Sequence, residues 1–178
     1  SPHLYRKLPV DPAKDFVALT LAVKVPEVLI THPSLPVRTA KELAALAKSR
    51  PGQIAYGSTG TGGMPHLAAE SFRLAAGISI LHVPYKGAAP AMTELLGGQV
   101  QLSILDVPVL LPHVKAGRLR ALATASGARA PTLPEVPTMA EAGYPSVIAD
   151  NWYGFVAPAA TPRDVVARLH ELLVRTLQ

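Results

Sequence analysis

The amino-acid sequence predicts an α/β fold, with a mostly parallel sheet that carries helices on both faces. Apolar runs of strand length alternate repeatedly with segments whose apolar residues recur at helical spacing, and glycine or proline marks the turns. This alternation is typical of βαβ units, whose strands run parallel. The 178 residues are 49% apolar and only 16% charged, which is enough for one ordinary domain with a buried core.

The strands are expected where apolar residues are continuous or alternate over a few positions. Residues 1–14 precede the first of them and contain three prolines, so an extended arm with at most one helical turn is expected there. Pro26 interrupts the first run and predicts a kink or an edge at that point. The expected strands are 16–31, 54–56, 78–83, 100–105, 119–124 and 147–156.

The helices are expected where capping residues and apolar spacing coincide. Thr39 and Glu42 have the spacing of a capping box. Pro162 stands at the first position of a final helix. Its apolar stripe consists of Val165, Val166, Leu169, Leu172, Leu173 and Leu177. One helix is expected to begin at 39–42, and a second to run from about Met64 to Ala76. Two further helices are expected to end at 97–98 and at 116–117. A short helical piece is expected at 138–142, after a surface loop over 126–137, and a final helix begins at Pro162.

The most informative stretch is IAYGSTGTGGMPHLAAE, residues 54–70. It passes from a strand end through a glycine-rich loop into a helix. Glycines let a backbone approach a ligand closely, and the first helical turn offers unpaired N–H groups at its positive end. The hydroxyls of Ser58, Thr59 and Thr61 add neutral donors. The stretch therefore predicts a site for a carboxylate or a phosphate, although a turn that only reverses the chain explains it equally well.

The spacing of this stretch excludes several familiar anion and nucleophile sites. No lysine follows the glycines as in a phosphate-binding P-loop, and the dinucleotide pattern G-x-G-x-x-G is absent. The sequence around Ser58 is not the G-x-S-x-G of a nucleophile elbow. His66 could still partner Ser58 in a small hydrolase, but we favour a role for His66 as a ligand contact or a polar lining residue in the first helical turn.

Composition narrows the class of function. The net charge of +5 is spread along the chain without runs of lysine or arginine, which argues against nucleic-acid binding and favours anionic ligands. The chain has no cysteine, and its six histidines lack metal-ligand spacing, so neither a metal nor another cofactor is expected. No apolar segment is long enough to span a membrane. The first residue is Ser1 and no signal-peptide pattern follows it, so a processed or truncated chain is expected.

Three consecutive βα turns carry polar groups at the edge of the sheet where ligands of α/β proteins bind. These turns are 57–63, 84–87 and 106–108. Because all three consecutive turns carry polar groups at this edge, a ligand-binding role is favoured over a purely structural one. For Tyr85 and Lys86 a solvated turn remains the alternative to ligand contact, and for Trp152 we expect core or hinge packing.

Six blocks, in this order along nearly the whole chain, resemble one family. They are HLYRKLPVDPAKDF, PGQIAYGSTGTGG followed by HLA, HVPYKGAAPAMTELLGGQV, LPHVKAGRLRALA, PTLPEVPTMAEAGYP and NWYGFVAPAATP. Together they resemble the Bug-type solute-binding proteins of tripartite tricarboxylate transporters. The resemblance implies a periplasmic-binding-protein-like (type II) lobe of a two-lobed "Venus flytrap" receptor. Such a receptor binds a small carboxylate in the periplasm and delivers it to a membrane permease, and it is not an enzyme.

The resemblance also implies ligand contacts in each of the three turns. At the third turn the family commonly has Asp followed by Asn or Ser before the proline, whereas this chain has Leu105 and Asp106. Either Asp106 takes that role or it selects a ligand that carries an amine. The contacts implied are Ser58, Thr59, Gly60, Thr61, Gly62, His66, Tyr85, Lys86, Gly87 and Asp106.

Compared with the family pattern, the opening strand with its P-F-x-x-G-G type block and the closing helix and strand are missing. We therefore expect a truncated receptor in which residues 23–149 form the second lobe. Residues 1–22 and 150–178 are then remnants of the first lobe. The apolar stripe of the last helix is expected to fold back onto the lobe, to pair with a second copy, or to be covered by segments on a separate piece.

Two other classes of function stay open at this stage. The same fold serves as an effector-sensing domain in transcription regulators and in receptors that feed sensor kinases. The third class, a hydrolase based on Ser58 and His66, is the least favoured. The sequence does not name the carboxylate.

Overall fold

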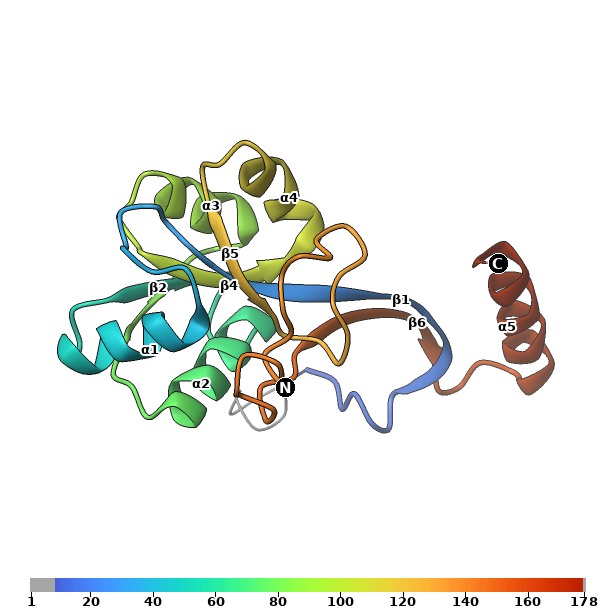
Figure 1. The fold of residues 1–178 in the computed structure, drawn as a ribbon. Helices are drawn as coiled ribbons and strands as arrows, with labels where there is room; N and C mark the ends of the chain where they lie inside the picture. The colour runs from blue at the N-terminus through green and yellow to red at the C-terminus, as the bar shows by residue number, and fades with distance from the viewer. Residues whose placement is uncertain (1–8, 178) are drawn as a thin grey trace. The chain divides into compact units, whose positions relative to one another are not determined.

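The computed structural model describes residues 9–177, which fall into two compact units. The larger unit runs from Val25 to Asn151, and the smaller unit combines the residues up to Lys24 with those from Trp152 onward. Two strands, β1 (Phe16–Thr31) and β6 (Asp150–Pro158), carry the chain from one unit to the other (Figure 1). The assignment of these units to the lobes of a receptor stays a prediction.

The sheet contains one strand that runs against the others. Its order is β3-β2-β4-β1-β5, and β6 pairs with β1 off this path. β2 is parallel to β3 and β4, whereas β1 is antiparallel to both of its neighbours, β4 and β5. The mostly parallel sheet predicted from the sequence is confirmed. The remaining strands are β2 (Ala55–Ser58), β3 (Leu81–Pro84), β4 (Leu102–Asp106) and β5 (Arg120–Thr124).

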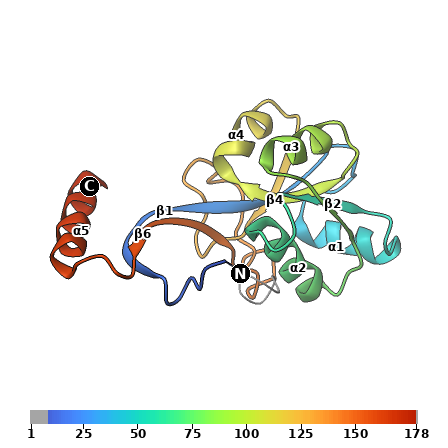
Figure 2. The ribbon, with the colours of Figure 1, turned by 180° about the vertical axis from the view of Figure 1, so that it is seen from behind.

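Helices cover both faces of this sheet, as expected (Figures 1 and 2). The helices α1 and α2 pack on one face and α3 and α4 on the other. On β1 the side chain of Leu29 joins the α1/α2 core, while Val28 and Ile30 join the α3/α4 core. All three are completely buried, which is the pattern of a central strand. The bounds are α1 (Ala40–Ser49), α2 (Met64–Ala76), α3 (Ala88–Leu96) and α4 (Val107–Lys115).

The predicted capping box at the start of α1 is present. The Thr39 hydroxyl accepts a hydrogen bond from the Glu42 N–H at 3.1 Å. The Glu42 carboxylate in turn accepts one from the N–H of Arg38 at 2.6 Å, one residue before the cap. These side chains satisfy backbone donors that the helix itself cannot pair.

The segment 126–142 differs from its prediction in two respects. Residues 138–142 form hydrogen-bonded turns rather than a short helix, with Thr138 and Glu141 bonding each other's backbone N–H. The preceding stretch is not only a surface loop, because Ala130, Leu133 and Val136 are at most 5% exposed and belong to the α3/α4 core. The three apolar positions are spaced three apart, but the prolines of this stretch led to the prediction of a surface loop.

The smaller unit contains the amphipathic helix α5 (Arg163–Leu177). No residue of α5 is buried among those described, and Val165, Leu169 and Leu172 of its apolar stripe are 37–41% exposed. Trp152 is 62% exposed, so the expectation of core packing for this residue is wrong. No described helix combines the length and the apolar character that crossing a bilayer requires.

The capping box yields a stability prediction. Thr39→Ala removes the acceptor of the Glu42 N–H and should lower the free energy of unfolding by about 1 kcal/mol in urea denaturation. Thr93→Ala is the matched control, because the Thr93 hydroxyl on α3 only bonds back to the Ala89 carbonyl at 3.1 Å. Equal losses for the two variants would contradict a capping role for Thr39.

Candidate functional site

Three helix N-termini meet at one edge of the sheet. α2, α3 and α4 each follow the carboxyl end of a parallel strand, and those strands are neighbours in the order β3-β2-β4. None of the three helices has a side-chain hydrogen bond at its N-cap. α1 follows the antiparallel strand β1, so it begins at the opposite edge, and there Thr39 caps it. The N-caps of α2 and α3 are Gly63 and Gly87, which suits anion binding, whereas the N-cap of α4 is the acidic Asp106.

The first turn is the glycine-rich loop between β2 and α2. Gly60 has a φ of +133° and Gly62 a φ of +81°, values that side chains other than hydrogen rarely allow. The Gly60 N–H donates to the Ser58 hydroxyl oxygen at 3.2 Å, and the Gly62 N–H donates to His66 Nδ1 at 3.1 Å. Two side chains that flank the loop therefore fix its backbone.

Beneath the loop lies a histidine that the sequence analysis did not single out. His82 on β3 has its Nε2 atom 2.7 Å from the hydroxyl oxygen of Ser58. Its ring stacks on that of His66 at a centroid distance of 4.2 Å and on that of Tyr56 at 4.8 Å. Burial, and then the nearby His66, hold the pKa of His82 below its ordinary value. The stack thus favours the neutral form of His82.

A short polar chain supports the other side of this stack. The Tyr56 hydroxyl donates to Glu70 at 2.8 Å, and Arg73 donates to the other oxygen of the same carboxylate at 2.8 Å. Burial and the Glu70 hydrogen bond raise the pKa of Tyr56. Burial alone would raise the pKa of Glu70, but the hydrogen bonds from Tyr56 and Arg73 lower it below the ordinary value. Glu70 stays ionised and holds Tyr56 in place.

These contacts contradict a hydrolase built on Ser58 and His66. The imidazole nitrogen within hydrogen-bond distance of the Ser58 hydroxyl is Nε2 of His82, and Nδ1 of His66 accepts a hydrogen bond from the N–H of Gly62. Ser58 is also completely buried, so its hydroxyl cannot attack a substrate. Spacing along the chain suggested the wrong partner, because parallel pairing of β2 with β3 brings position 82 to this place.

The second turn is joined to the first. The N–H of Tyr85 donates to the Ser58 carbonyl at 3.0 Å. The Tyr85 ring lies only 3.3 Å from where a Cβ on Gly57 would be, so Gly57 makes room for the ring. Tyr85 also packs against the α3/α4 core, which makes part of its role structural. Lys86 is exposed, and Gly87, with a φ of +111°, leads into α3.

The third turn lies beside a group of acidic residues. Asp106 ends β4 and receives the Asn151 side-chain amide, with distances of 3.3 and 3.2 Å to its two oxygens. Asp150 accepts a hydrogen bond from the Ser126 hydroxyl. The fully buried Glu27 pairs with Asp106 across the β1–β4 ladder, and neither of its carboxylate oxygens has a hydrogen-bond partner among the described residues.

Glu27 was missed in the sequence analysis, although a charged residue within the apolar run VPEVLI was a visible signal. Burial, and then the neighbouring Asp106 and Asp150, raise the pKa of Glu27 from 4.5 to about 8. The carboxyl is therefore mostly protonated at neutral pH. Within the described part of the chain no group of three His, Asp or Glu side chains is arranged to hold a metal ion.

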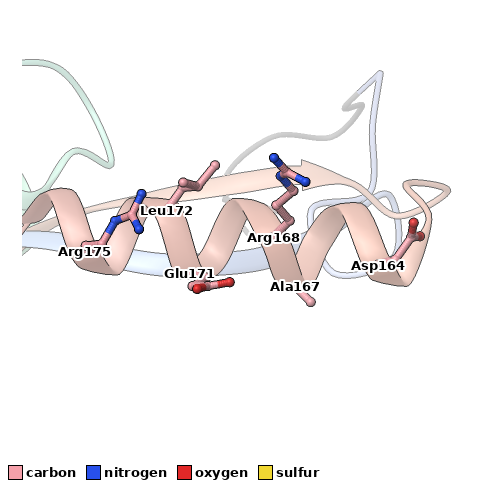
Figure 3. A pocket seen from close by; sticks show the side chains of 6 residues that line it. All are labelled: Asp164, Ala167, Arg168, Glu171, Leu172 and Arg175. Carbon is pink, nitrogen blue, oxygen red and sulfur yellow. The ribbon is translucent and has the colours of Figure 1, made fainter.

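Two hollows of the described structure are lined by residues outside the three turns. One of about 590 Å³ is lined by residues of α5 alone, whose side chains fan out from a single helix (Figure 3). They are Asp164, Ala167, Arg168, Glu171, Leu172 and Arg175. Another of about 240 Å³ lies between α1 and the turns around Glu141. A single helix face does not enclose a ligand, and we place the candidate site at the turns, where the glycine-rich loop and the N-termini of α2 and α3 follow neighbouring strands.

Comparison with known proteins covers the whole chain. Residues 1–178 match the family model described as "Tripartite tricarboxylate transporter family receptor". Protein BugT of Bordetella pertussis is 38% identical over 175 residues, which are 98% of this chain and 54% of BugT. The chain thus spans about half the length of the curated relatives that it matches.

Two solved structures share both fold and sequence with the chain. R. palustris Rpa4515 with adipate superposes with a TM-score of 0.88 and is 37% identical, over 95% of this chain and 56% of its own. The periplasmic binding protein BugD gives a TM-score of 0.87 at 37% identity, over 97% and 57% of the two chains.

The buried carboxyl of Glu27 predicts how stability depends on pH. The folded state keeps the Glu27 proton up to about pH 8, whereas the unfolded state loses it near pH 4.5, so stability should fall as the pH rises through this window. Glu27→Gln should remove that slope and should be more stable than the original chain by on the order of 4 kcal/mol above pH 8. Chemical denaturation at pH 5 and pH 8.5 measures the difference.

Glu135→Gln provides the control, because it removes an exposed carboxyl group and leaves the buried Glu27 unchanged. Its unfolding free energy should follow that of the original chain at both pH values. If Glu27→Gln also followed the original chain, the carboxyl of Glu27 would not be buried in its neutral form.

Proposed function

The chain belongs to the tripartite tricarboxylate transporter receptor family, and on that premise we propose that it forms the carboxylate-binding lobe of an extracytoplasmic solute receptor. The resemblance seen in the sequence is confirmed. The receptor would capture a small carboxylate in the periplasm and deliver it to the membrane permease of the transporter. The observation that carries this proposal is that the N-termini of α2 and α3, neither of which has a side-chain cap, lie at the same edge of the sheet as the glycine-rich loop.

In this proposal the ligand carboxylate accepts hydrogen bonds from the Ser58–Gly63 loop and the first turn of α2. Thr59 and Thr61 add hydroxyl donors from partly or fully exposed positions, while the buried Ser58 orders the loop through Gly60 and His82. His66 supports the loop through Gly62. Tyr85, Lys86, Gly87 and Asp106 complete the proposed contacts from the second and third turns.

The rest of the receptor is also part of the proposal. The larger unit corresponds to the second lobe, predicted at 23–149, and the smaller unit to parts of the first lobe, predicted at 1–22 and 150–178. Two lobes that close on a ligand exclude water and contact it from both sides. Because only one lobe is substantially present in the 178 residues, this chain alone should bind dicarboxylates weakly, in a range suited to titration by nuclear magnetic resonance.

The loop glycines give the first test of the binding site. Gly62→Val places a β-branched side chain at a φ of +81°, which costs of order 1–3 kcal/mol and displaces the loop N–H groups. The original chain should show chemical-shift changes when it is titrated with adipate, the ligand named for Rpa4515, or with succinate or citrate. We expect these changes to disappear in Gly62→Val, while the resonances of core residues still show a folded protein.

Gly127→Val is the matched control, because Gly127 has no positive φ and a Cβ added there would meet no atom within 4 Å. Its titration should equal that of the original chain. Unchanged binding by Gly62→Val would show that the loop does not hold the carboxylate.

We further propose that the 178-residue chain forms a two-fold dimer through α5. The exposed stripe on this helix supports this, since burying such side chains is worth about 1.5–3 kcal/mol each. Light scattering should give twice the monomer mass, and Leu169→Glu with Leu173→Glu should give a monomer. A monomer in both cases with unchanged thermal stability would contradict the dimer and would mean that the stripe stays exposed.

A further inference from the structure

Glu27 occupies a position that is costly for a carboxyl group. It is completely buried, and neither oxygen has a hydrogen-bond partner among the residues described. In the antiparallel ladder it lies directly opposite Asp106, and directly opposite residues project to the same face of a sheet. Like charges in such a pair are unfavourable, and an unpaired buried polar group is unfavourable as well. The protein tolerates both at the edge where the ligand is proposed to bind.

The charges that act on Glu27 have the same sign. Asp106 acts on it from β4 and Asp150 from the start of β6, and over residues 9–177 no lysine, arginine or histidine offsets them in shifting the pKa of this carboxyl. Glu27, Asp106 and Asp150 are called the acidic group below. Burial is the first cause that keeps Glu27 protonated, and a cation that arrived beside this group would offset the repulsion that adds to it.

A metal ion does not fit this acidic group. Over residues 9–177 no three acidic or histidine side chains have the mutual placement of metal ligands. An organic cation such as an ammonium group suits the acidic group better, because it needs hydrogen-bond acceptors rather than a closed ligand shell.

The acidic group lies next to the proposed carboxylate loop. β2, which leads into the loop, and β4, which ends at Asp106, are adjacent parallel strands. Adjacent strands are about 4.8 Å apart. Glu27 and Asp106 also share the face of Leu29 and Ile104, which is the face that α2 covers. An anionic and a cationic group separated by one or two carbon atoms could occupy the two positions together.

We propose that the ligand of this site is an amino carboxylate, whose ammonium group lies against Asp106 in the field of the acidic group. This inference rests on the proposed function, since it assumes that the carboxylate binds at the glycine-rich loop. Asp106 would accept the hydrogen bond, and Glu27 would act behind it. When the cation arrives, the Glu27 carboxyl would give its proton to the solvent and balance the added charge.

The test uses two pairs of probes, and the two members of each pair differ only in the amino group. They are succinate with L-aspartate and glutarate with L-glutamate, titrated into the 178-residue chain and followed by nuclear magnetic resonance, which detects weak binding. We expect the amino member of at least one pair to bind at least tenfold more tightly. Asp106→Asn and Glu27→Gln should each reduce this preference at least threefold, whereas Glu135→Gln, which removes an exposed acid, should keep it.

The protonation of Glu27 provides a readout that a purely structural role would not change. In a chain with ¹³C-labelled glutamate, the Glu27 carboxyl resonance should move toward its ionised position when the amino probe binds at pH 7, and it should not do so with the plain diacid. Should Glu27→Gln fold poorly, this resonance and Asp106→Asn still test the inference.

The outcomes separate the inference from the function on which it rests. Equal or tighter binding of the plain diacids, or a preference that both variants retain, would overturn the amino carboxylate while leaving the receptor function in place. If adipate binds but neither member of either probe pair does, the amino carboxylate is likewise overturned and the receptor function is left in place. Absence of binding by every carboxylate tested would overturn both.

Discussion

The antiparallel insertion of β1 between β4 and β5 decides where everything else in the larger unit lies. Because β1 runs against its neighbours, Glu27 lies opposite Asp106 at the edge where β4 delivers the chain into α4. The part of β1 that belongs to the larger unit therefore begins at the edge of the three turns. The same reversal sends α1 to the opposite edge, where the Thr39 side chain caps it.

The first turn depends on neutral groups rather than on charge. Its backbone is held by Ser58 and His66, and the stacked rings of His66, His82 and Tyr56 fill the space below. The carboxylate tied to this stack is that of Glu70, and Arg73 neutralises it. An anion at the loop would thus meet N–H groups and a helix dipole, with little opposing negative charge.

The sequence could predict features that depend on local chemistry and not those that depend on tertiary contact. The capping box at Thr39 and the glycine-rich turn follow from residues a few positions apart, and both are present. The pairing of Ser58 with His82 spans 24 residues and exists only because β2 and β3 are neighbours. Glu27 shows the same limit, since its place beside Asp106 depends on where β1 enters the sheet.

The edge of the sheet consequently has two ends of opposite character. Toward β3 and β2 the chain offers the N-termini of α2 and α3 and the exposed Lys86, all of which attract an anion. Toward β4 and β1 it offers the acidic group, in which Asp106 and Asp150 add to burial in raising the pKa of Glu27. In the proposed binding mode, a plain dicarboxylate would contact the glycine-rich loop through one carboxylate, and the acidic group would repel the other. The order of the strands would then set the direction in which the ligand lies along the edge.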